Sequence, residues 1–360
     1  MRSFTSNSKR PSSLSTALWA FGMTFLVISV SFYFFDALNP AQCWKADLPP
    51  IVTNDPYVIL ETYTDQAPDL YREYYGIGPA IEKAREADIL IVGNSKPYFG
   101  FQNHAVQEFE KKTGHRVYNL SIPNGDKLAM TQKLIERHHL RPALLIVNEN
   151  HFFGPGVSPY TEETLRMGYL QALSRIFEID SSWFFRSHLH HWLPRLGLGK
   201  LFGPIPIVTC RSLYNGCLCM ENFEKSLVPV ADKRFSEEEL TIEEFNNAMA
   251  FKKEMEDQGT QMVLTSVPYG TDDVDHLDKW IKDPERRKWI AQAVSGYERI
   301  DQMAKKLGLP CITTRDEGLF TFDGIHLDEP SAEKFANSFF IALQKNPVFQ
   351  KFQKQVSTEQ

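Results

Sequence analysis

Two short segments near opposite ends of the chain carry the residue types needed for acyl chemistry on a serine. The segment 89–95 (I-L-I-V-G-N-S) has the pattern of a buried strand with Ser95 just past its carboxyl end, where reactive groups sit in open α/β sheets. The segment 322–326 (F-D-G-I-H) places Asp323 three residues before His326. At this spacing a carboxylate can orient an imidazole, which can then take the proton of a serine hydroxyl. We therefore predict a triad of these three side chains.

A serine that attacks an acyl carbon also needs hydrogen-bond donors for the oxyanion. The segment 123–125 (P-N-G) follows the second predicted strand, and its tight turn can aim a backbone N–H of Asn124 or Gly125 at the site. Asn150 follows the third predicted strand, and its side-chain amide can act beside the backbone N–H of Ser95. Because all these groups follow strand ends, we expect them along one edge of one sheet.

Alternating strand and helix patterns are expected to hold these groups in place. Apolar runs predict five strands, at 88–93, 116–120, 143–148, 262–267 and 311–314. Helical periodicity predicts helices at about 102–113, about 127–140, in a long stretch through Leu307, and at 329–343. This alternation indicates parallel strands joined by crossover helices, so the predicted class is α/β with a five-stranded parallel sheet.

The regular alternation is interrupted between 152 and 240, a segment rich in aromatic residues, Pro and Gly. Because it begins just after the third strand, it could form a lid or a substrate- and membrane-facing subdomain over the site. An additional packing layer remote from the site fits the sequence equally well. We expect a main domain over 71–345, preceded by a linker or extended arm over 36–70 and followed by a tail over 346–360.

The N-terminal part of the chain has the pattern of a membrane anchor. No charged residue occurs in 11–35, and the apolar run 14–35 has about the ~20 residues that a spanning helix needs. The basic residues before it are Arg2, Lys9 and Arg10. This bias predicts a cytoplasmic tail over 1–13 and a periplasmic or extracytoplasmic location for the rest, on a single-pass inner-membrane protein. A cleaved signal peptide and a buried core helix are the alternatives.

Composition and cysteine spacing indicate which classes of partner and cofactor the chain is expected to lack. The chain has 360 residues, a net charge of -6 and a pI near 6.0, which argues against a nucleic-acid partner because such proteins usually present a basic face. Three cysteines lie close together, namely Cys210, Cys217 and Cys219. Their spacing matches no common zinc-ligand pattern, so we expect no metal and no cofactor. One disulfide among them is an expectation for an oxidising compartment, with its pairing open.

Taken in order, these segments resemble the four sequence blocks of the SGNH or GDSL hydrolase family. That family carries Ser, Gly, Asn and His on a flavodoxin-like parallel sheet, with the Asp of its triad three residues before the His. The residues G-N-S at 93–95 are similar to the first block, with Asn94 in place of the usual Asp. The run D-G-I-H-L at 323–327 is similar to the last block. The resemblance covers about 88–150 and 260–345.

The two middle blocks resemble the family pattern less closely. The run N-L-S-I-P-N-G at 119–125 is similar to the second block, whose glycine aligns with Asn124 or, after a shift of one residue, with Gly125. The run N-E-N-H at 148–151 is similar to the third block, keeping its Asn at Asn150 without the flanking Gly and Asp. The family resemblance implies that these positions form the oxyanion site.

The resemblance implies a serine O-acyl esterase or O-acyltransferase with an acyl-Ser95 intermediate. Membrane-tethered relatives in this family move acyl groups onto or off extracytoplasmic glycans. Together with the expected anchor, this implies an acylated cell-envelope glycan as substrate and a membrane-bound acyl donor protein as a partner. Two alternatives stay open. One is a lipid-active esterase or lysophospholipase on the same triad, and the other is a non-catalytic scaffold of a polysaccharide assembly or export machine.

Overall fold

The chain divides into two units, 1–57 and 58–360. The computed structural model describes Met23 and residues 58–62, 68–78, 80–122, 127–149, 152–178, 208–212, 218–219, 228–229, 241–268, 297–314, 316–322 and 325–359. Apart from Met23, the expected anchor at 14–35 lies outside these residues. Within the described ranges, no helix has the length and apolar character needed to cross a bilayer.

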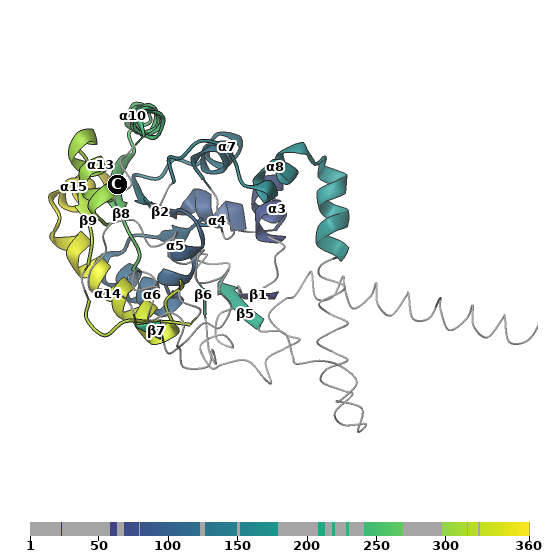
Figure 1. Cartoon of the computed structure of the whole chain (residues 1–360), viewed down its shortest axis with the longest axis horizontal. Coiled ribbons are helices and arrows are strands. Elements are labelled where there is room, and N and C mark those ends of the chain that lie inside the picture. The colour runs from purple at the N-terminus through teal and green to yellow at the C-terminus, as the bar shows by residue number, and fades with distance from the viewer. Residues whose placement is uncertain are drawn as a thin grey trace, which may run out of the picture. The chain divides into compact units, whose positions relative to one another are not determined.

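A five-stranded parallel sheet forms the centre of the 58–360 unit (Figure 1). Its strands are β2 (Ile89–Val92), β3 (Val117–Asn119), β4 (Leu144–Asn148), β8 (Gln261–Thr265) and β9 (Cys311–Ile312). Their order across the sheet is β3-β2-β4-β8-β9, and every neighbouring pair is parallel. The chain therefore runs outward from β2 first to one side and then to the other. This is the flavodoxin-like order, with a switch point between β2 and β4 where ligands bind in such folds.

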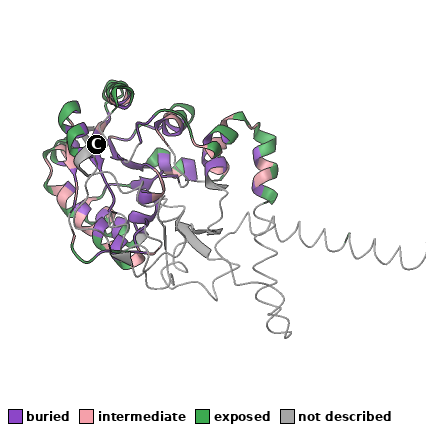
Figure 2. Ribbon diagram, in the orientation of Figure 1, coloured by how far each residue is buried: buried purple, intermediate pink, exposed green. Residues whose placement is uncertain are grey.

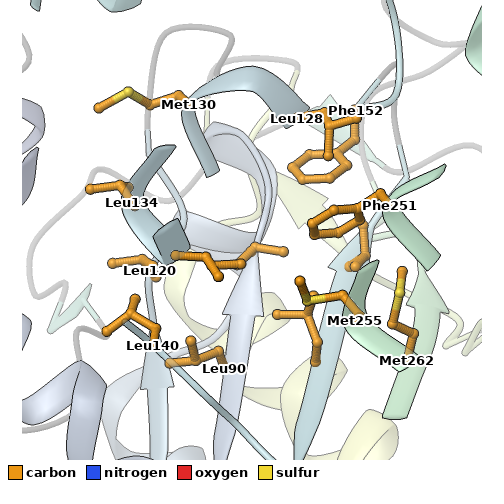
Figure 3. Packing of buried hydrophobic residues seen from close by; sticks show 14 of the residues in the cluster. Leu90, Leu120, Leu128, Met130, Leu134, Leu140, Phe152, Phe251, Met255 and Met262 are labelled. Atoms are coloured by element: carbon orange, nitrogen blue, oxygen red, sulfur yellow. The ribbon is translucent and has the colours of Figure 1, made fainter. Parts of the chain in front are cut away.

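Helices cover both faces of this sheet, which explains why β2 is apolar throughout and β4 is apolar up to Asn148 at its end. All residues of β2 and β4 are buried (Figure 2), as expected for parallel strands between two helical layers. On one face lie α7 (Leu128–His138), α10 (Ile242–Asp257) and α13 (Tyr297–Leu307). Figure 3 shows the packing there, with Leu90 of β2 near Leu140 and with Phe152 beside Phe251. The other face packs against α6 (Asn103–Thr113) and α14 (Glu329–Lys345).

The predicted strands are confirmed, with ends shifted by at most two residues. The same holds for the helices predicted at 102–113, 127–140 and 329–343. Two short helices precede the first strand of the sheet, α3 (Pro68–Tyr75) and α4 (Ala80–Glu86). The α/β class with a flavodoxin-like parallel sheet is therefore correct.

The C-terminal segment differs from the expected tail at 346–360. It forms α15 (Pro347–Glu359), and its Phe349 and Phe352 are buried against the core. The Phe349 ring lies 5.7 Å from Phe109 of α6, and the Phe352 ring lies 4.5 Å from the imidazole of His115. Burial of a large apolar side chain is worth ~1.5 to 3 kcal/mol, so this helix adds to the stability of the domain.

Strands of the 152–240 segment pair with strands outside it. Strand β5 (Val208–Ser212) pairs with β1 (Val58–Thr62) of the expected arm and with β6 (Leu218–Cys219), both in antiparallel fashion. Strand β7 (Val228–Pro229) pairs with β10 (Phe320–Thr321). The second pairing connects the insertion directly to the strand that leads into residues 322–326. Residues 228–229 of the insertion therefore lie beside the strand that precedes residues 322–326, and not remote from it.

Candidate active site

Ser95 is the first residue of α5 (Ser95–Gly100), which begins just after β2. The turn between them depends on Gly93, whose φ of +151° is one that residues with a side chain rarely adopt. A Cβ at this position would lie 2.8 Å from Pro97 Cγ and 2.9 Å from Asn148 Cβ. The absence of a side chain thus allows α5 to pack closely over the strand ends and brings Ser95 to the carboxyl edge of the sheet.

Asn94 caps the helix that carries Ser95. Its side-chain Oδ1 accepts a hydrogen bond of 3.0 Å from the backbone N–H of Lys96. An Asp would make the same cap, because Asn and Asp are both strongly preferred at this position. The departure from the family pattern at residue 94 therefore leaves the local geometry intact.

Two buried asparagines stand at the ends of the strands on either side of β2. Asn119 of β3 donates from Nδ2 to the Pro97 carbonyl of α5 (3.0 Å) and accepts at Oδ1 from Ser121 N–H (3.1 Å). Asn148 of β4 accepts at Oδ1 from Val267 N–H (2.9 Å), and its Nδ2 has no hydrogen-bond partner among the described residues. These amides connect α5 to β3 and β4 to the end of β8, and so fix the frame around Ser95.

His326 meets Ser95 although 231 residues separate them in the chain. Its Nε2 lies 2.8 Å from Ser95 Oγ, the imidazole is buried, and Ser95 is half-buried. With the proton on Nδ1, a neutral imidazole accepts the serine proton at Nε2, the arrangement required of a general base. The predicted nucleophile and base are therefore hydrogen bonded at the carboxyl edge of the sheet.

The segment that carries His326 is closed at its base by backbone contacts. Phe322 N–H donates to the His326 carbonyl over 2.9 Å, and Thr321 forms an antiparallel bridge with Leu327. The loop between Phe322 and His326 is therefore short and held at both ends. Helix α14 begins just beyond it, and its buried face anchors this loop to the core.

Two aromatic rings contact the imidazole of His326. The Phe99 ring lies 4.6 Å from it at an interplanar angle of 46°, and the Phe322 ring stacks on it at 5.7 Å and 24°. The two phenyl rings are 5.5 Å from each other. These separations fall within the range of favourable aromatic contacts. The imidazole is thus held by two rings as well as by its hydrogen bond to Ser95.

Sequence reasoning missed four residues that shape this site, namely Asn119, Asn148, Phe99 and Phe322. A usable signal existed for the asparagines, because each is a polar residue at the end of an apolar strand. The signal for Phe99 was its position four residues after Ser95, which puts both on one face of a helix. Phe322 lay inside the segment that carries the predicted base, but its type gave no indication of a role.

The remaining predicted residues are Asp323, Asn124, Gly125 and Asn150, and they lie outside the described residues. The orienting carboxylate and the oxyanion donors therefore stay predictions. In the ranges that the structure describes, no three His, Cys, Asp or Glu side chains gather closely enough to hold a metal ion. The three neighbouring cysteines are described only in part, with Cys210 and Cys219 opposite each other in the β5–β6 register.

Cys311 is another nucleophilic side chain on this sheet, in β9. Burial, together with the neighbouring Asp301 carboxylate, raises the pKa of the Cys311 thiol to about 12. A thiol reacts as its thiolate, so this side chain stays protonated and unreactive near neutral pH. Cys311 is therefore a poor candidate for a nucleophile near neutral pH.

No known protein-family model matches the chain, and no curated protein matches its sequence.

Proposed function

We propose that the chain is a serine O-acyl esterase or O-acyltransferase of the SGNH or GDSL type. The 2.8 Å contact between Ser95 Oγ and His326 Nε2 carries this proposal. It supports a nucleophile and base at the carboxyl edge, next to the switch point between β2 and β4 where α/β folds bind ligands. The same contact favours an enzyme over a non-catalytic scaffold, since a scaffold has no need for a buried base on a serine hydroxyl.

The proposed reaction has two halves that use the same base. His326 takes the proton of Ser95 Oγ as the oxygen bonds to the acyl carbon, and the protonated imidazole then gives that proton to the departing alcohol oxygen. In the second half, His326 takes a proton from water or from a sugar hydroxyl. That oxygen bonds to the acyl carbon, and the proton returns to Ser95 Oγ as the ester to the enzyme breaks. Asp323 would orient the imidazole, and Asn150 with the backbone N–H of Asn124 or Gly125 would bind the oxyanion.

The proposed substrate is an acylated glycan of the cell envelope. Support comes from the uncharged run 14–35 with basic residues before it, which favours a membrane anchor and an extracytoplasmic domain. It comes also from the resemblance to membrane-tethered members of the family. In an acyltransferase of this kind, a membrane-bound protein would supply the acyl group and the glycan hydroxyl would resolve acyl-Ser95.

A lipid-active esterase on the same residues is the second candidate. The observation that favours it is the pairing of β7 with β10, which joins residues 228–229 of the aromatic-rich segment 152–240 to the strand before the loop of His326. An apolar segment at that location could contact acyl chains or a bilayer surface. Parallel assays with an acetylated oligosaccharide and with a lysophospholipid would separate the two substrates.

The test of the proposed function is labelling of the full-length chain with a fluorophosphonate, which reacts with an activated serine. We expect one label on Ser95, located by peptide mass spectrometry, and none in Ser95→Ala. Ser338→Ala is a matched control on α14, where the hydroxyl bonds Asp316 away from the site, and we expect it to label fully. A label that persists in Ser95→Ala, or a wild-type chain that does not react, would contradict the proposal and favour the scaffold.

A further inference from the structure

We propose that Phe99 and Phe322 are positioning residues that hold the His326 imidazole in line with Ser95 Oγ. This inference rests on the proposed function and deepens it, because it assigns the orientation of the base to apolar side chains as well as to a carboxylate. A phenylalanine side chain has no polar atom and cannot itself transfer a proton to or from the serine. Each ring acts through the imidazole that it contacts.

Phe99 connects the position of the base to that of the nucleophile. It lies four residues after Ser95 on α5, so the two side chains share one face of the same helix. Ser95 Oγ contacts the imidazole edge at Nε2, while the Phe99 ring contacts it at a centroid distance of 4.6 Å. Phe99 is itself almost fully buried and packs edge-on against Tyr98 at 5.3 Å. One short helix therefore carries both the proposed nucleophile and one of the two rings that contact the base.

Phe322 supplies the second ring contact, from the same loop that carries His326. Its ring stacks on the imidazole at 24° and meets Phe99 at 66°, so the three rings form one cluster. Its backbone N–H holds the His326 carbonyl, which sets the distance between the two residues along the loop. Together these contacts oppose rotation of the imidazole about its side-chain bonds. They favour the ring orientation in which Nε2 faces Ser95 Oγ.

The size of the effect follows from how strictly proton transfer depends on geometry. A misplacement of about 1 Å can cost ~10²-fold in rate. Replacing a ring by leucine keeps an apolar side chain but removes the flat face, so the imidazole gains freedom to tilt. We expect the reaction of Ser95 with the fluorophosphonate to slow ~10-fold in Phe322→Leu and by a larger factor in Phe99→Leu.

The chain offers matched controls for both positions. Phe320 lies two residues before Phe322, is 41% exposed, and makes no ring contact with His326 in the described structure, so Phe320→Leu should react at the wild-type rate. Phe322→Tyr keeps the aromatic face and should restore most of the rate. For the buried Phe99, the control is Phe251→Leu, which removes an equally buried ring on the opposite face of the sheet.

The experiment measures the second-order rate of fluorophosphonate labelling at Ser95 in the full-length chain, with a thermal unfolding curve for every variant. A second readout is the NMR signal of the His326 ring protons, which lie within the ring-current shift of the two phenyl rings. We expect Phe322→Leu to lose part of that shift together with rate, while Phe251→Leu loses stability and keeps the rate. Wild-type rates in folded Phe322→Leu and Phe99→Leu would overturn the inference while leaving the proposed function in place. A wild-type chain that does not label would overturn both.

Discussion

The polar side chains at the two edges of the central sheet are hydrogen bonded in different ways. At the amino edge, carboxylates are bound by backbone. Glu110 Oε1 accepts from Val117 N–H and Asp88 Oδ2 accepts from Arg116 N–H, each over 2.8 Å. These side chains hold the start of β3 in place between α6 and β2. These carboxylate oxygens therefore accept hydrogen bonds that stabilise the fold.

At the carboxyl edge, some buried polar atoms lack a hydrogen-bond partner among the described residues. Three of them are Ser121 Oγ, Asn148 Nδ2 and Thr314 Oγ1. A buried polar group that is left without a partner costs ~1 to 3 kcal/mol. The hydrogen bond between Ser95 and His326 lies at this edge. The described polar side chains of the amino edge thus hold the fold together, whereas the carboxyl edge carries the two side chains that the proposed reaction requires.

The sharpest way to break this comparison is to remove the reactive pair. Ser95→Ala and His326→Ala should each lower hydrolysis of a short-chain activated ester by ~10⁴- to 10⁶-fold, because nucleophile and base act as a unit. The thermal unfolding temperature should change little, since the fold does not depend on their hydrogen bond. Steady-state kinetics with a chromogenic ester measures the first quantity. Activity in Ser95→Ala equal to that of wild type would contradict the assignment of Ser95 as the nucleophile.

A backbone change at the same edge should affect stability and rate together. Gly93→Ala adds a Cβ that meets Pro97 and Asn148 below 3.0 Å, at a φ that disfavours any side chain. We expect a loss of ~2 to 4 kcal/mol in the free energy of unfolding, measured by urea denaturation, and slower labelling of Ser95. Gly114→Ala is the control, because its φ is +75° but nothing lies within 4 Å of the added atom. A smaller loss there with unchanged labelling is expected, whereas equal losses would argue against the close packing of α5.

The amide that joins α5 to β3 should have the next largest effect. Asn119→Ala leaves Ser121 N–H without its side-chain partner and removes the side-chain hydrogen bond to the Pro97 carbonyl, which keeps its bond from Phe101 N–H. We therefore expect a loss of ~2 kcal/mol in the free energy of unfolding. Because α5 carries Ser95, labelling should slow as well. Thr260→Val removes a comparable buried hydrogen bond, from Thr260 Oγ1 to the Pro142 carbonyl at the amino edge, and should lower stability without slowing labelling. Slower labelling in both variants would erase the distinction between the edges.

The smallest effect concerns pH and the amino edge. Burial raises the pKa of Glu110 from 4.5 to about 7, against the opposing pull of its hydrogen bond from Val117 N–H and of Arg116, and with help from Asp88. A carboxyl with a raised pKa in the folded state favours folding below its unfolded pKa, and that contribution is lost as pH rises through 7. Glu110→Gln should therefore lose less stability between pH 5 and pH 8 than wild type, by on the order of 1 kcal/mol.

Urea denaturation at a series of pH values measures this difference, and labelling of Ser95 in Glu110→Gln at a single pH provides the control. The labelling rate should equal that of wild type, because the amino edge lies at the other end of the strands. A parallel pH dependence of stability in the two proteins would contradict the assignment to Glu110.

The sheet was predictable because its strands are continuous apolar runs, such as I-L-I-V before Gly93 and L-L-I-V before Asn148. Local pattern determines such elements almost alone. The site was predictable only where residue type itself signals chemistry, as for Ser95 and His326. The roles of Asn119 and Asn148 depend on β2 lying between β3 and β4. The order of strands across a sheet is set by tertiary packing and not by the residues adjacent in the sequence.

The same reason explains what was missed outside the site. Helix α15 was expected as a tail because its sequence is mostly polar, with Phe349 and Phe352 too few to give a strong helical pattern. Its burial depends on the ring of Phe109, which is distant in the chain. The pairing of β7 with β10 is likewise a contact between distant segments, and a two-residue strand leaves no periodicity to read.

The 231-residue separation between Ser95 and His326 has a consequence for how the protein is made. Chains are synthesised from the N-terminus at about 5 to 20 residues per second, and contacts between distant residues form late in folding. The proposed nucleophile leaves the ribosome many seconds before the proposed base, and α14 must dock before the two can meet. A nascent or prematurely terminated chain would therefore hold an inert serine, and reactivity would arise only with the nearly complete polypeptide.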